Sequence, residues 1–280
     1  MKKQKPLFDP SSDHPLPSSR WILLGDTLRY RFWDVVGASI LAGVFFVPFF
    51  AWLMFVYLTG RADPSNFFSI LMTYLVAVPL LMIGGLGEAG LSYFFKKLVW
   101  GQGASLPGDF FEGIAKNFKT FLGVFLGIGL LYLLLKLDLV SLSISTLPGA
   151  AKAALEGASY ALFFILLMPF LFLMSETVIY EGGFFSLLSN GFRFTFGAIL
   201  LNIPLIGAYL LPFIILEFIP YIAAIVTSYL FATIFYFAFA SLFFTLYSHS
   251  LFDRSINKDH YPEIIRKGLA KTNESHDHDQ

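Results

Sequence analysis

Six long apolar runs alternate with short polar segments along this chain, and they limit the folds that it can adopt. A helix needs about 20 mainly apolar residues to cross the hydrocarbon core of a bilayer. The six predicted spans are Val35–Leu58, Phe67–Gly87, Phe121–Leu137, Ala158–Met174, Phe194–Leu216 and Tyr221–Ser248. We therefore predict an all-α fold, an integral membrane six-helix bundle.

The composition agrees with this class of protein. Hydrophobic residues make up 56% of the chain and charged residues only 14%, whereas soluble domains carry about 25% charged residues. The formal net charge is zero, which gives no indication of a nucleic-acid partner. The chain has no cysteine, so disulfides, thiolate metal sites and cysteine nucleophiles are excluded. Residues 1–31 lack the pattern of a cleaved signal peptide, and we expect the first span to remain as an anchor.

The basic residues indicate which side of the membrane is cytoplasmic, because Lys and Arg concentrate in cytoplasmic loops. With six spans, sixteen of the 19 Lys and Arg residues fall on the side that holds both termini, and only Arg61, Lys136 and Lys152 fall on the other side. We expect a multi-pass protein of a bacterial cytoplasmic membrane with both termini in the cytoplasm. Residues 1–19 and 254–280 would be polar cytoplasmic tails of one transmembrane domain, residues 20–253.

Two segments of similar sequence precede predicted spans. GDFFEGIAKNFKTFLG runs from Gly108 to Gly123, and GGFFSLLSNGFRFTFG runs from Gly182 to Gly197. On a helix, each would place its aromatic residues on one face and its polar residues on the other. In the first copy, Glu112 and Lys116 have the favourable i,i+4 spacing. We expect both segments to be amphipathic helices in the inner membrane interface.

A weaker third copy, Asp26–Gly37, suggests an internal repeat. The chain would then consist of three units, each an interfacial amphipathic helix followed by a transmembrane hairpin, at about residues 20–100, 101–181 and 182–253. The alternative is that every membrane hairpin carries a basic, aromatic inner edge without any repetition.

The polar residues at the inner ends of the spans form the candidate site. Ionisable residues deep in a membrane usually mark function, but the centres of the predicted spans contain none. The candidate cluster at the inner face is Glu88, Asn117, Glu176, Asn190, Arg193 and His249. The alternative is that these residues lie in the hydrated membrane interface and pair with nearby Lys and Arg side chains.

Sequence motifs of common enzymes are missing. The chain has no HExxH, GxSxG, Walker A or dinucleotide-binding motif. His249 and Asp253 lie four residues apart, but one such pair makes no metal site. His276 and His278 alternate with aspartates in a tail that we interpret as solvated. We therefore predict no enzyme activity, no cofactor and no metal.

Several uncharged polar residues lie within the spans, namely Thr73, Thr195, Asn202, Thr227 and Ser228. They could line a path for a small solute. Residues of this kind also form hydrogen bonds between membrane helices, and the sequence leaves both interpretations open.

The segment GGLGEAGLSYFFKKLVWGQGASLPGDFFEGIAKNFKTFLG, Gly84–Gly123, resembles the signature of the YesL-like family of uncharacterised bacterial polytopic membrane proteins. The resemblance is carried by a Gly/Ala-rich helix end, a basic segment, Asp109-Phe-Phe and Asn117-Phe-Lys. The family's Pro-x-x-Thr-x-Gly pattern appears here as Pro79-Leu-Leu-Met-Ile-Gly, without the threonine. The resemblance implies an association with carbohydrate-uptake systems.

We therefore expect a non-enzymatic integral membrane protein that serves as an accessory or assembly component linked to carbohydrate uptake. The alternative is a passive or facilitated small-solute transporter. The expected partners are the lipid bilayer and either transporter subunits or further copies of the chain, and no nucleic acid.

Overall fold

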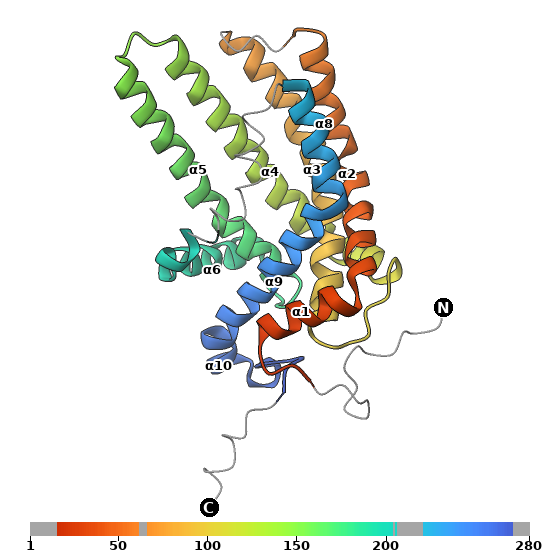
Figure 1. The fold of residues 1–280 in the computed structure, drawn as a ribbon. Coiled ribbons are helices and arrows are strands. Elements are labelled where there is room, and N and C mark those ends of the chain that lie inside the picture. Colours follow the sequence, from red (N-terminus) through yellow and green to blue (C-terminus); the bar gives the residue numbers. More distant parts are fainter. Residues whose placement is uncertain (1–15, 62–65, 204, 206–220, 271–280) are drawn as a thin grey trace, which may run out of the picture.

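The computed structural model describes residues 16–61, 66–203, 205 and 221–270, and every regular element in these ranges is helical. The elements are α1 (Arg20–Tyr30), α2 (Phe32–Leu58), α3 (Phe67–Val99), α4 (Gly108–Ile144), α5 (Gly149–Thr177), α6 (Phe184–Gly197), α8 (Tyr221–Phe231), the π-helix η1 (Ala232–Tyr236), α9 (Phe237–Arg254), α10 (Ile256–His260) and the 3₁₀-helix η2 (Pro262–Ile264). Figure 1 shows their arrangement.

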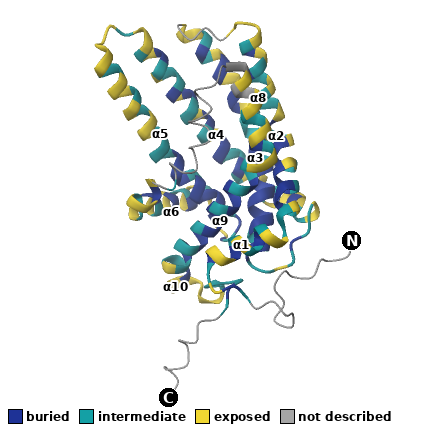
Figure 2. Cartoon of the chain, viewed as in Figure 1, coloured by how far each residue is buried: buried dark blue, intermediate teal, exposed yellow. Residues whose placement is uncertain are grey.

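Five helical stretches are long and apolar enough to cross a membrane. They are α2, α3, α4, α5 and Val226–Arg254, which comprises the end of α8, η1 and α9. Large apolar side chains such as Val44, Leu134 and Leu162 are exposed on their outer faces, and Figure 2 shows a run of exposed residues along α5. The all-α, multi-pass membrane class predicted from the sequence is confirmed.

The hairpin of α3 and α4 is longer than predicted. Helix α3 continues past the expected end at Gly87 to Val99. Helix α4 is continuous for 37 residues, or about 55 Å at 1.5 Å per residue. The expected boundary between an interfacial helix and the span Phe121–Leu137 is therefore wrong. The two helices pack along the added length, since a Cβ placed on Gly113 would lie 2.9 Å from the Ala89 carbonyl oxygen of α3.

The helical backbone breaks in or directly after the other two predicted entry segments. Helix α1 is followed by Arg31, where φ is −126° and ψ is 21°, and α6 is followed by Ala198, where φ is −126° and ψ is 29°. The predicted span Phe194–Leu216 therefore does not begin at Phe194, whose backbone belongs to α6. Residues 204 and 206–216 of that span lie outside the described residues.

Helix α6 lies across the lower end of α5 (Figure 1). The side chain of Phe185 is 82% exposed and that of Phe196 is 57% exposed, whereas Leu187, Gly191 and Thr195 face the protein. This one-sided burial is typical of an amphipathic helix at a membrane interface.

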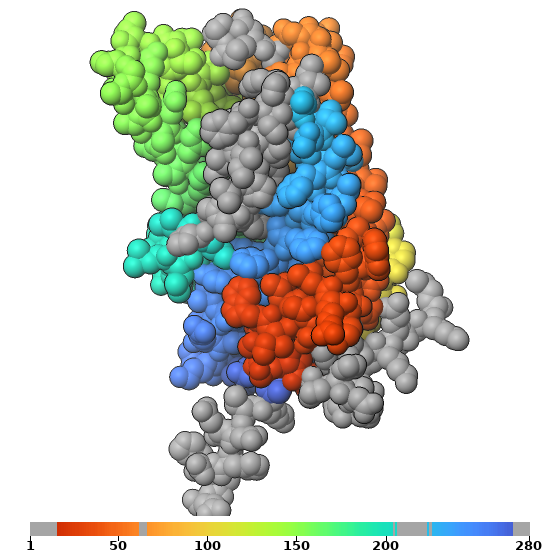
Figure 3. Space-filling view, viewed as in Figure 1, coloured from red at the N-terminus to blue at the C-terminus, as the bar shows by residue number. Residues whose placement is uncertain are grey.

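The described ends of the chain meet at one end of the bundle. The Ala270 N–H donates to the Pro17 carbonyl at 3.0 Å. Figure 3 shows the surface of α1 lying directly against that of α9 and α10 at this lower end. We call this region, formed by α1, α10, the end of α9 and the segment up to Ala270, the base of the bundle.

A π-helical turn interrupts the last span where it contacts α2. The Ser39 hydroxyl of α2 accepts from the Ala238 N–H at 3.3 Å and donates to the Ala232 carbonyl at 3.3 Å. A Cβ on Gly43, one turn further along α2, would lie 2.4 Å from Cγ2 of Thr233. Ser39 and Gly43 of α2 therefore both lie against the last span.

Candidate functional site

The six residues predicted to form an inner-face cluster occupy several separate environments. Glu88 of α3 is buried, with 8% of its surface exposed, and it lines a small cavity together with Ser241 of α9. Ser92, Ser175 and Thr245 line the same cavity, whose volume is ≈ 10 Å³. A cavity of this size holds about one water at most.

Glu176 and Asn190 are the two candidate residues that a hydrogen bond joins. Asn190 Nδ2 of α6 donates to Glu176 Oε2 at 3.3 Å, near the end of α5. The Glu176 side chain is fully buried, and its Oε1 atom has no partner among the described atoms. A carboxyl group in this position holds α6 against α5 with only one long hydrogen bond.

His249 lies at the inner end of α9 and contacts a tryptophan. Trp100 Nε1 donates to His249 Nδ1 at 3.3 Å, so the neutral ring carries its proton on Nε2. That Nε2 atom is buried and has no partner among the described atoms. The ammonium groups of Lys96 and Lys267 lie 4.5 and 4.3 Å from the centroid of the Trp100 ring.

Within the described chain, the two remaining candidates form no hydrogen bond or ion pair with these groups. Asn117 donates to the Gly113 carbonyl of its own helix at 3.0 Å, and Arg193 is exposed on α6. Hydrogen bonding therefore connects only one pair of the predicted cluster.

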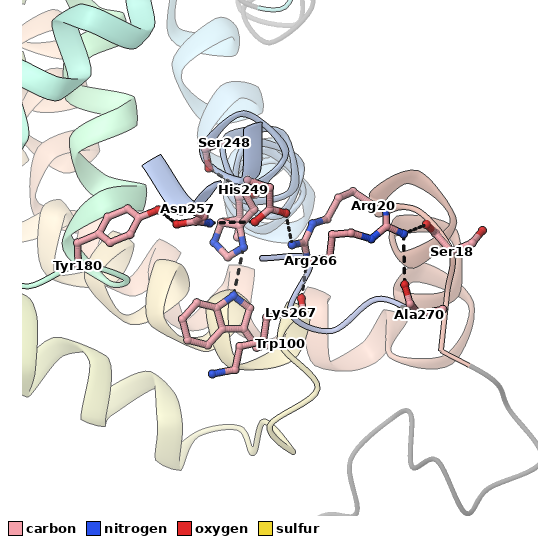
Figure 4. A network of polar contacts seen from close by, with 12 residues as sticks. Ser18, Arg20, Trp100, Tyr180, Ser248, His249, Asn257, Arg266, Lys267 and Ala270 are labelled. Carbon is pink, nitrogen blue, oxygen red and sulfur yellow. Dashed lines mark hydrogen bonds and ion pairs between the residues drawn. The ribbon is translucent and has the colours of Figure 1, made fainter. Parts of the chain in front are cut away.

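The structure assembles a polar network at the base that sequence reasoning missed (Figure 4). Arg20 of α1 forms an ion pair with Asp253 of α9 at 2.9 Å and donates to the Lys267 carbonyl at 2.9 Å. Asn257 Nδ2 donates to Asp253 Oδ1 at 2.9 Å, and the Tyr180 hydroxyl donates to Asn257 Oδ1 at 2.6 Å. The network thus joins α1, α9, α10 and the segment after α5.

Burial raises the pKa of the Tyr180 hydroxyl, and the nearby carboxyl groups of Glu176 and Asp253 raise it further. The phenol therefore remains protonated and acts as the donor in its bond to Asn257.

A second charged cluster, also missed, joins α3 to the start of α4. Lys97 Nζ lies 2.6 Å from Asp109 Oδ1 and 2.9 Å from Glu112 Oε2, and Lys116 Nζ lies 2.6 Å from Glu112 Oε1. The Tyr93 hydroxyl donates to Glu112 Oε1 at 2.9 Å. The predicted i,i+4 pair of Glu112 and Lys116 is confirmed, and it forms part of a larger group.

In the part of the chain that the structure describes, no group of three His, Cys, Asp or Glu residues is placed to hold a metal ion. His276 and His278 lie outside the described residues. Protein-family models, curated proteins and solved structures gave no match when they were compared with the chain. The resemblance to the YesL-like family therefore depends on the residues of Gly84–Gly123 alone.

Proposed function

We propose that the chain crosses a bacterial cytoplasmic membrane six times, with both termini in the cytoplasm. The hydrogen bond between Ala270 and Pro17 supports this proposal, because segments that meet at one end of a bundle lie on the same side of the membrane. An even number of crossings is then required. Five helices are described as long and apolar enough, and the predicted span Phe194–Leu216 would supply the sixth.

Single cysteines would test this topology, since the chain has none of its own. Gly25→Cys marks α1, Lys258→Cys marks α10, and Gly149→Cys marks the start of α5 at the far end; a Cβ at Gly25 or Gly149 meets no atom within 4 Å. An impermeant thiol reagent should label the first two from the cytoplasmic side and the third from the opposite side. Labelling of Gly25→Cys and Lys258→Cys from opposite sides would contradict the proposal.

Within this topology, the three-unit repeat remains part of the proposal. Its support is the sequence match between Gly108–Gly123 and Gly182–Gly197 and the amphipathic burial of α6. The different backbone course of α4 and α6 means that the units would have diverged in how the entry helix joins its span.

As function we propose a non-enzymatic membrane component that acts as an accessory or assembly partner of a carbohydrate-uptake system. The observation that carries this proposal is the distribution of polar groups. Inside the bundle, the Thr73 and Thr195 hydroxyls donate to carbonyls of their own helices at 2.8 Å. In contrast to these internal hydroxyls, the ion pairs of the described chain gather near the base and at the α3–α4 junction. A bundle built in this way anchors a charged face that can contact other proteins.

The alternative, passive or facilitated transport of a small solute, has less support. Asn202 Nδ2 donates to the carbonyls of Phe194 and Thr195 at 3.0 Å, and the Tyr247 hydroxyl donates to Asn202 Oδ1 at 2.5 Å. The amide of Asn202 is thus engaged on both sides, as expected for a group that holds helices together.

Site-specific photo-crosslinking in bacterial membranes would separate the two functions. A crosslinker in place of Lys119 or Arg193, both exposed near the inner end, should capture subunits of a carbohydrate transporter. The same crosslinker in place of Leu134, on an exposed apolar face, is the control and should capture none. Absence of transporter subunits at all three positions, together with solute flux in liposomes that Asn202→Ala abolishes, would favour the transporter.

A further inference from the structure

A pocket of ≈ 340 Å³ opens at the base of the bundle, where the start of α1 meets the end of α9 and the segment after α10. Its lining includes Ser18, Ser19, Arg20, Asp253, Arg254 and Arg266. The volume lies at the lower end of the range of small-molecule sites. The pocket shares Arg20 and Asp253 with the charged base on which the proposed function rests. Phosphate binding and capture of a transporter subunit are measured separately, so either proposal can fail without the other.

The lining carries more positive than negative charge. Arg20, Arg254 and Arg266 face one carboxylate, Asp253, which is already paired with Arg20 at 2.9 Å. Arg266 Nη2 donates to two neutral carbonyls, those of Ser18 at 2.9 Å and Ala270 at 3.3 Å. Arg254 forms no ion pair with any described residue. Two of the three guanidinium charges therefore lack a counter-charge in the described part of the chain.

Arg20 and Arg266 lie close enough for their positive charges to repel each other. Figure 4 shows their side chains running past one another in opposite directions. Burial lowers the pKa of Arg20 from its ordinary value, Asp253 opposes this effect, and the charge of Arg266 lowers the pKa further. Like charges brought together in a protein are stabilised when an anion lies between them.

Two buried donors of the arginines that line the pocket have no acceptor among the described atoms. Arg20 is 6% exposed, and its Nε–H has no partner among the described atoms; the same is true of the buried Nε–H of Arg266. A buried donor without an acceptor is costly, and both of these donors belong to side chains beside the pocket. The N-terminus of the 11-residue helix α1 faces the same pocket, and the Ser19 hydroxyl accepts from the Ile22 N–H only. Free amide groups at a helix N-terminus favour an anion.

We propose that this pocket binds a phosphate group, held by Arg254, Arg266 and the start of α1. Guanidinium groups match the geometry of phosphate oxygens and form two parallel hydrogen bonds with them. Trp21 lines the pocket and is 56% exposed beside it, as expected of an aromatic residue at a membrane interface. The phosphate can belong to a lipid head group or to a soluble phosphorylated compound, because both present the same oxygens.

The test uses the full-length protein with two probes. One is inorganic phosphate added to protein in a neutral detergent. The other is a nanodisc that contains phosphatidic acid and phosphatidylcholine, compared with one of phosphatidylcholine alone. Binding is followed by the phosphate-dependent rise in melting temperature and by the amount of phosphatidic acid that co-purifies. Arg254→Gln is the main variant, because this exposed side chain is not needed for folding contacts that the structure shows.

Arg254→Gln should weaken phosphate binding about tenfold, as expected for the loss of a charge-assisted hydrogen bond. Arg266→Gln should weaken it at least as much. Arg193→Gln, which removes an exposed arginine outside the pocket, is the matched control and should leave binding unchanged.

Binding of inorganic phosphate that depends on Arg254 supports the pocket with a soluble ligand. Binding only of phosphatidic acid, with the same dependence, supports it with a lipid. Binding of neither probe, or an equal loss in Arg193→Gln and Arg254→Gln, overturns the proposal.

Discussion

Arg20 and Asp253 form a buried ion pair at 2.9 Å that joins the first described helix to the end of the last span, 233 residues later in the chain. Their side chains are 6% and 12% exposed. Removing one partner of such a pair leaves an uncompensated charge, whereas replacing both with apolar residues is much less costly.

We therefore expect Arg20→Met alone and Asp253→Leu alone each to destabilise the protein by about 3 kcal/mol, and the double variant to be less destabilised than the sum of the two. Reversible unfolding in mixed micelles would measure all three variants. Simple additivity of the two losses would show that the pair contributes no coupling.

The contact of Ser39 with the π-helical turn gives a second prediction. Ser39→Ala removes the acceptor of the Ala238 N–H, which lies in a buried part of the last span. An unpaired buried donor costs about 1–3 kcal/mol, so we expect a loss of stability in this range. Faster amide hydrogen exchange at Ala238 should accompany it.

Ser248→Ala is the matched control for this substitution. Ser248 is also fully buried on the last span, and its hydroxyl donates to the Thr245 carbonyl of its own helix at 3.0 Å. Its removal leaves the helical backbone bonds intact, and the loss should stay below about 1 kcal/mol. Equal losses of stability in Ser39→Ala and Ser248→Ala would show that the bond from the Ala238 N–H to Ser39 contributes no more than an ordinary hydroxyl bond within a helix.

Gly43 gives a third prediction, because a Cβ there would lie 2.4 Å from Cγ2 and 2.7 Å from Oγ1 of Thr233. Gly43→Ala should separate α2 from the last span and lower stability by about 1–3 kcal/mol. Gly157→Ala on α5 is the control, since a Cβ at that exposed position meets no atom within 4 Å. There alanine should be neutral or stabilise by up to about 1 kcal/mol. Melting temperatures of the two variants in one detergent would decide the matter, and a similar change in both would contradict the predicted contact.

The helical membrane class could be predicted from the sequence because apolar runs of about 20 residues have few other uses. The ends of the helices could not. The predicted span ended at Gly87, but α3 continues to Val99 because Phe94, Phe95 and Leu98 are buried by neighbouring helices. Hydropathy does not distinguish burial in protein from burial in lipid.

The candidate site was harder to predict than the fold. Residue type and expected side of the membrane identified Glu176 and Asn190, which do bond to each other. The same criteria counted Arg20, Arg254 and Arg266 only as topological markers. Their meeting at one pocket depends on contacts between residues more than 230 positions apart, which single-sequence patterns do not contain. The i,i+4 pair of Glu112 and Lys116 was predictable because it lies within one helix.

Glu176 gives the last prediction. Its buried side chain accepts one hydrogen bond, from Asn190 at 3.3 Å, and its Oε1 atom has no partner among the described atoms. Glu176→Gln keeps an oxygen that can accept from Asn190 and removes any cost of a buried charge. We therefore expect this variant to be at least as stable as the original protein. Glu176→Ala removes the acceptor and leaves a cavity between α5 and α6, so it should lose about 2 kcal/mol or more. Denaturant unfolding at neutral pH would compare the two variants. A marked loss of stability in Glu176→Gln, similar to that of Glu176→Ala, would mean that the ionised carboxylate has a favourable partner and would contradict this account.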